Sequence, residues 1–121
     1  MRFHFAGLGL LAALGGVPVP DAMAQRAGSY AVEGQAPDGS RYEGAAQFQP
    51  TGPQTWRVTW RVAGETMSGI GITAGNVLSV AFTMQRELGA AVYEIQPDGT
   101  LRGRWTAGPN GGVGSERLLP R

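Results

Sequence analysis

The sequence contains no cysteine and no lysine, and its single histidine is His4. Residues 25–121, the part that we expect to remain after export, therefore have no imidazole, thiol or amine side chain. The usual general base, the thiol nucleophile, the Schiff-base amine and nearly all zinc, copper and haem ligands are absent from that part. We expect a protein that is not an enzyme and that needs no cofactor or metal.

A strong excess of charge is missing as well. The formal net charge is +1 at pH 7, and all ten basic residues are arginines. Nucleic-acid-binding domains usually carry clustered lysine and arginine in a strongly basic chain. The sequence therefore predicts no nucleic-acid partner.

The N-terminus has the three-part layout of a secretory signal peptide. Arg2 precedes the apolar run at residues 6–17, and Ala22-Met23-Ala24 forms a small-residue cleavage site. The apolar run is shorter than the ~20 residues of a membrane-spanning helix, which disfavours an uncleaved anchor. We predict a signal peptide at residues 1–24 and a single exported domain at 25–121, periplasmic or extracellular, with no membrane span after cleavage.

The rest of the chain consists of short runs of alternating apolar and polar residues, separated by glycine- and proline-containing turns. The expected strands cover residues 29–35, 41–49, 55–62, 66–72, 77–83, 89–95, 100–106 and 113–119, with a loop at 50–53 and a polar connection at 84–88. All connections are too short for parallel crossovers, so the sheet should be an antiparallel meander. Closing it would remove two exposed edges and give the apolar rows one interior. We predict an all-β fold with about eight strands closed into a barrel, and a two-sheet sandwich is the alternative.

Two similar turn sequences support this meander. Pro37-Asp38-Gly39-Ser40 and Pro97-Asp98-Gly99-Thr100 each follow a strand that carries a tyrosine. Proline presets the first turn position, aspartate bonds to nearby backbone, and glycine supplies a positive φ. We interpret both aspartates as turn residues rather than cation ligands.

Aromatic residues on the apolar rows are the first candidates for function. An eight-stranded barrel is either filled by side chains or holds one small ligand, and Gly44 and Gly103, beside large aromatics, make room for either a tryptophan ring or a ligand. Arg117 is expected to stack across Trp105. The interior ligand-binding candidates are Tyr42, Trp56, Trp60, Tyr93 and Trp105, with Tyr30 in the same aromatic set.

The second candidate is an outer row on residues 55–62. Arg57, Thr59 and Arg61 alternate with the apolar residues of this strand. Arginines are favoured anchors at protein interfaces, so this row is a candidate surface for a protein partner. Catalysis by paired carboxylates is disfavoured, because five glutamates fall mostly at outward positions and no spacing pairs them. They are Glu33, Glu43, Glu65, Glu94 and Glu116.

Residues 30–117 resemble a group of small exported bacterial proteins of hypothetical status, some of which are labelled fibronectin-binding protein. The resemblance lies in Tyr30-Ala31-Val32-Glu33-Gly34, residues 37–44, Trp56-Arg57-Val58-Thr59-Trp60, Gly69-Ile70-Gly71, residues 99–105 and residues 114–118. More loosely, Gly103-Arg104-Trp105 with Arg117 is similar to the Gly-x-Trp and arginine pair of the calycins (lipocalins and avidins), although there the Gly-x-Trp lies on the first strand.

Two functions remain open at the sequence level. The resemblance implies adhesion to an extracellular matrix or cell-surface protein of the fibronectin type. The aromatic interior instead indicates a carrier for a small hydrophobic or aromatic ligand. An open apolar cavity of several hundred Å³ would favour the carrier, and a filled interior would exclude it.

Overall fold

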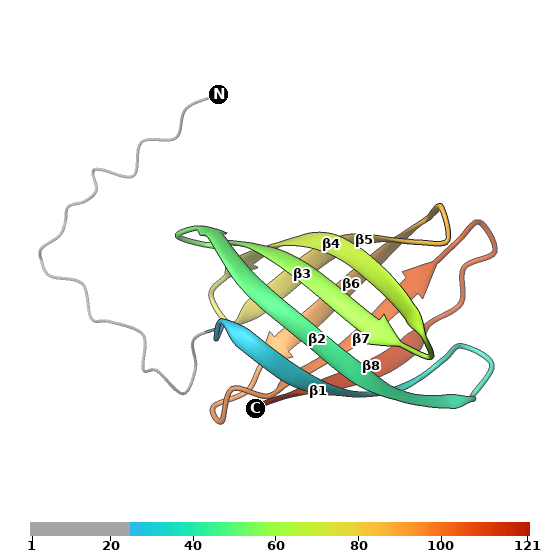
Figure 1. Cartoon of the computed structure of the whole chain (residues 1–121), viewed down its shortest axis with the longest axis horizontal. Coiled ribbons are helices and arrows are strands. Elements are labelled where there is room, and N and C mark those ends of the chain that lie inside the picture. The colour runs from blue at the N-terminus through green and yellow to red at the C-terminus, as the bar shows by residue number, and fades with distance from the viewer. Residues whose placement is uncertain (1–24) are drawn as a thin grey trace, which may run out of the picture.

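The computed structural model describes residues 25–121, so the predicted signal peptide lies outside the described residues. Eight antiparallel strands follow one another around a closed barrel, and β8 pairs with β1 to complete it (Figure 1). This confirms the prediction of an eight-stranded barrel over the two-sheet sandwich. The strands are β1 (Gly28–Gln35), β2 (Arg41–Gly52), β3 (Thr55–Val62), β4 (Glu65–Ala74), β5 (Val77–Met84), β6 (Glu87–Ile95), β7 (Leu101–Ala107) and β8 (Gly114–Pro120).

Two expected connections are shorter than predicted. The loop expected at residues 50–53 is wrong for its first part, because β2 continues to Gly52, with Pro50 opposite Trp56 and a register shift between Pro50 and Gly52. A β-bulge of this kind lets a strand accommodate an extra residue and a proline. The connection expected at 84–88 is a two-residue turn at Gln85 and Arg86, whose φ values are 50° and 71°. Tight hairpin turns need such positive φ values at both central residues.

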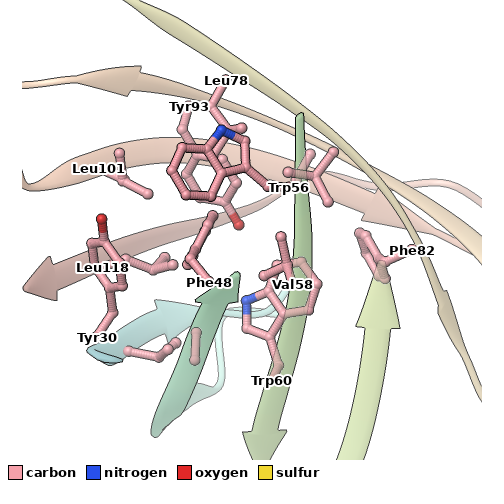
Figure 2. Packing of buried hydrophobic residues seen from close by; sticks show 14 of the residues in the cluster. Tyr30, Phe48, Trp56, Val58, Trp60, Leu78, Phe82, Tyr93, Leu101 and Leu118 are labelled. Carbon is pink, nitrogen blue, oxygen red and sulfur yellow. The ribbon is translucent and has the colours of Figure 1, made fainter. Parts of the chain in front are cut away.

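The inward side chains of one end of the barrel form a packed core. The two hairpin turns β2–β3 and β4–β5 lie at this end, together with the β6–β7 turn and the C-terminus (Figure 1). Phe48 contacts Tyr30 and Trp56 with ring centroids 4.9 and 6.1 Å apart. The side chains that are almost completely buried are Tyr30, Val32, Phe48, Val58, Leu78, Leu101 and Leu118. Figure 2 labels all of these except Val32.

The first described residues cover this end. The Tyr30 hydroxyl donates a 2.7 Å hydrogen bond to the backbone oxygen of Arg26 and accepts one of 2.8 Å from the Gln25 side chain. The hydrogen-bonding groups of the buried phenol are thereby satisfied, and the barrel is closed here.

No helix in residues 25–121 is long and apolar enough to cross a membrane.

Candidate functional site

The opposite end of the barrel is hollow. The β1–β2, β3–β4, β5–β6 and β7–β8 connections meet there, and a cavity of about 230 Å³ opens between them. Its wall is mainly apolar and aromatic, as ligand pockets usually are. The lining residues are Ala36, Tyr42, Trp60, Val62, Ala63, Glu65, Met67, Phe82, Met84, Tyr93, Trp105 and Glu116.

A buried carboxylate lies in the wall of this cavity. Glu116 on β8 is only 8% exposed. Its Oε1 accepts a 2.7 Å hydrogen bond from the Tyr42 hydroxyl, and its Oε2 accepts bonds of 2.6 Å from the Tyr93 hydroxyl and 3.3 Å from Trp60 Nε1. Side chains from β2, β3, β6 and β8 therefore converge on one acidic group.

The ionisation of this cluster follows from its burial. Burial raises the pKa of Glu116, while the three donors act in the opposite direction by stabilising the carboxylate. Burial and the adjacent Glu116 also raise the pKa of Tyr42, and they raise that of Tyr93 well above its ordinary value. Both phenols therefore stay neutral hydrogen-bond donors.

Glu33, Glu43, Glu65 and Glu94 are exposed, as expected of glutamates at mostly outward positions, and Glu116 is the exception that faces inward. Leu118 is fully buried, and alternation along β8 places Glu116 and Gly114 on the same inward face. The sequence did indicate this orientation, because Leu118 is apolar and the residue two positions earlier in a strand lies on the same face. The alternation was missed because Glu116 is a polar residue.

Glycines make room for the aromatic side chains of the cavity. Tyr42, Phe82, Tyr93 and Trp105 each lie directly opposite a glycine on the neighbouring strand. A Cβ at those glycines would overlap the ring, so each ring occupies the space that a side chain at its glycine would need. The glycines are Gly34, Gly89, Gly103 and Gly114.

The two glycines that were expected to provide space behave differently. Gly103 accommodates the ring of Tyr93, as expected of a glycine beside a large aromatic. Gly44 instead lies against Val62 and the Arg61 backbone, so its close neighbour is aliphatic. Gly44 allows two strands to approach closely and accommodates no ring.

The structure brings four of the five interior candidates together. Tyr42, Trp60, Tyr93 and Trp105 line the cavity, whereas Trp56 is packed against Phe48 in the closed end. The expected stacking of Arg117 on Trp105 is wrong. Arg117 points outward from β8 and forms a 3.0 Å ion pair with Glu33, both about half exposed, while Trp105 faces inward opposite Gly114.

The two aspartates of the similar turns are turn residues. Asp38 Oδ1 accepts hydrogen bonds from the Ser40 backbone nitrogen and hydroxyl at 2.9 and 2.7 Å, and Asp98 Oδ1 accepts one from the Thr100 nitrogen at 2.9 Å. These bonds lower the pKa of both carboxyl groups. Each aspartate thus stabilises the backbone of its own turn, as interpreted from the sequence.

The outer row on β3 has the predicted orientation. Arg57 and Arg61 are exposed and Thr59 is half-buried. Adhesion through this row stays a prediction.

Replacing Arg57 and Arg61 together with Ser should change the free energy of unfolding by no more than roughly 0.5 kcal/mol per site. The double variant should bind immobilised fibronectin more weakly, and the difference should depend on salt concentration. Surface plasmon resonance would measure this, and unchanged binding by the double variant would exclude the row.

Comparisons with known proteins bear on the fold. No protein-family model and no curated protein matches the sequence. Among solved structures, a redesigned β-barrel bound to DFHBI, mFAP1, has a TM-score of 0.67 at 16% identity, with 78% of this chain and 94% of that chain covered.

Two further designed proteins are similar. A redesigned β-barrel has a TM-score of 0.68 at 18% identity, covering 78% of this chain and 90% of that chain. A de novo designed fluorescence-activating β-barrel has a TM-score of 0.60 at 17% identity, covering 85% of this chain and all of that one. At these identities the likeness shows a shared β-barrel fold, and the resemblance to proteins labelled fibronectin-binding stays a prediction.

Proposed function

We propose that this protein is a non-enzymatic carrier that binds a small hydrophobic or aromatic molecule inside the open end of its barrel. The observation that carries the proposal is the cavity of about 230 Å³, whose largely aromatic wall adjoins the buried hydrophobic core of the barrel. An engineered apolar cavity of about 150 Å³ is enough to bind benzene. A ligand with one or two rings therefore matches this volume.

The division of the barrel supports a carrier. The closed end holds the fully buried side chains and supplies the packed core that a small domain without disulfides requires. The open end contributes less to that core, since Tyr42, Val62, Met67, Met84 and Trp105 are only partly buried there. The same barrel fold holds DFHBI in mFAP1. The export predicted from residues 1–24 would place the pocket outside the cytoplasm.

Blocking the cavity tests the proposal. Met67 lines the cavity, whereas its neighbour Thr66 is exposed on the outside of β4. Met67→Trp should fill part of the cavity and weaken binding of 1-naphthylmethanol by about tenfold or more. A tenfold loss of affinity corresponds to about 1.4 kcal/mol of binding free energy, which is similar to the loss of one hydrophobic contact. Isothermal titration calorimetry measures the affinity.

The matched control is Thr66→Trp, which adds the same side chain one residue away on the outer face. It should leave the affinity unchanged. The proposal fails if the unaltered protein does not bind the probe, or if the two variants weaken binding equally.

A further inference from the structure

We propose, resting on the proposed carrier function, that the ligand is an aromatic or apolar molecule that carries one ammonium group, and that this group is held by the Glu116 carboxylate. The charges around the cavity lead to this assignment. Glu116 and Glu65 are the two charged residues among those that line the cavity, and both are acidic. The described arginines, including Arg57, Arg61 and Arg117, have exposed side chains. The ionisable carboxyl groups of the wall therefore have no arginine beside them among the residues that line the cavity.

The hydrogen bonding of Glu116 leaves one position for a ligand. A carboxylate offers about four acceptor positions, two on each oxygen. Tyr93 and Trp60 occupy both positions on Oε2, and Tyr42 occupies one on Oε1. Among residues 25–121, the hydrogen bonds to Glu116 leave the second position on Oε1 open. An N–H donor from a ligand in the adjoining cavity would complete the set.

The three protein donors also favour a charged Glu116 when the ligand is bound. Each of them donates, so a carboxylate satisfies them better than a protonated acid, which brings a further donor into the cluster. A buried carboxylate with only neutral partners is costly. An ammonium group from the ligand would neutralise that charge in a site largely shielded from water, where charge-assisted hydrogen bonds are strong.

The aromatic wall suits the same chemistry. The rings of Tyr42, Trp60, Phe82, Tyr93 and Trp105 surround the cavity, and their faces attract cations. The apolar part of the ligand would pack against Met67, Val62 and Phe82. Glu65, at the β3–β4 turn, accepts a hydrogen bond from Gln85 and adds negative charge at the entrance.

Three naphthalene probes that differ in charge test the inference. They are 1-naphthylmethylammonium, 1-naphthylmethanol and 1-naphthoate, and calorimetry at neutral pH gives their affinities for the unaltered protein. The cation should bind about tenfold or more tightly than the neutral alcohol, in line with a hydrogen bond between charged groups, and the anion should bind most weakly. Glu116→Gln should abolish this preference, so that the cation and the alcohol bind with similar affinity. The matched control, Glu65→Gln, should keep most of it.

A pH series provides a measurement that needs no variant. Burial raises the pKa of Glu116, so its protonation should set in at a higher pH than that of an exposed glutamate, and lowering the pH should weaken binding of the cation more than binding of the alcohol. The other titratable groups that line the cavity are Tyr42, Tyr93 and Glu65. The two phenols stay neutral over this range, and repeating the series with Glu65→Gln removes the contribution of the entrance.

The possible outcomes separate the two proposals. If the unaltered protein binds the alcohol as tightly as the cation, or binds the anion best, the inference is wrong and the carrier function stands. If the preference survives Glu116→Gln or is lost with Glu65→Gln alone, Glu116 is not the anchor and the inference is wrong. If none of the three probes binds, both proposals fail. Should Glu116→Gln not fold, the probe series and its pH dependence on the unaltered protein decide.

Discussion

Trp60→Ala should lower the free energy of unfolding by about 3–5 kcal/mol, the usual cost of removing a large aromatic side chain from a core. Trp60 is 4% exposed and packs on Phe82 with ring centroids 5.5 Å apart. It also donates to Glu116 through Nε1, so its loss leaves the buried carboxylate with one donor fewer. Urea denaturation followed by circular dichroism measures the change. The same variant enlarges the cavity and should alter the affinity for 1-naphthylmethanol.

The adjacent residue provides the control for this prediction. Thr59 lies between Trp60 and Val58 on β3 but points out of the barrel. Thr59→Ala should therefore change the free energy of unfolding by no more than roughly 0.5 kcal/mol. Equal denaturation midpoints for the two variants would contradict the assignment of inward and outward faces on this strand.

Alternation and turn chemistry made the barrel predictable. On β3, large apolar residues alternate with threonine and arginine without interruption, and the structure buries that apolar row. The short connections excluded parallel strands, and closure followed because a flat meander of this length leaves two edges and one bare face. These features are local in sequence, so they can be read without knowing the neighbours in space.

The cavity and its charge could not be predicted in the same way. Whether an aromatic ring fills the barrel or lines a space depends on its rotamer, and the rotamer depends on the residue across the strand pair. Tyr93 lies against Gly103, and Trp105 against Gly114, because the β6–β7 and β7–β8 registers place these residues opposite each other. These pairings are non-local, so the sequence left a filled core and a pocket as alternatives.

The wrong prediction for Arg117 also has a structural cause. Arg117 and Glu116 are adjacent on β8, so one must face inward and the other outward. The prediction stacked Arg117 across Trp105, but Leu118 and Glu116 are buried, so Arg117 between them faces outward. Arg117 then pairs with Glu33, which lies opposite it on β1. A buried carboxylate with no basic partner is costly, and three hydrogen-bond donors reduce this cost for Glu116.

Phe48→Ala should destabilise the protein by about 3–5 kcal/mol and yet leave ligand binding by the folded fraction unchanged within about twofold. Phe48 is 1% exposed, packs between Tyr30 and Trp56 in the closed end, and is not among the residues that line the cavity. Its neighbour Gln49 is exposed, so Gln49→Ala should change the free energy of unfolding by no more than roughly 0.5 kcal/mol. Urea denaturation and calorimetry with 1-naphthylmethanol give the two quantities.

The comparison of Phe48 with Trp60 tests whether the two ends of the barrel have separate roles. Both side chains are buried and aromatic, and both variants should lose similar stability. They should differ in binding, because only Trp60 lines the cavity and contacts Glu116. If Phe48→Ala alters the affinity of the folded protein as much as Trp60→Ala does, the closed end takes part in binding. The ligand then interacts with the whole interior of the barrel rather than with a pocket at one end.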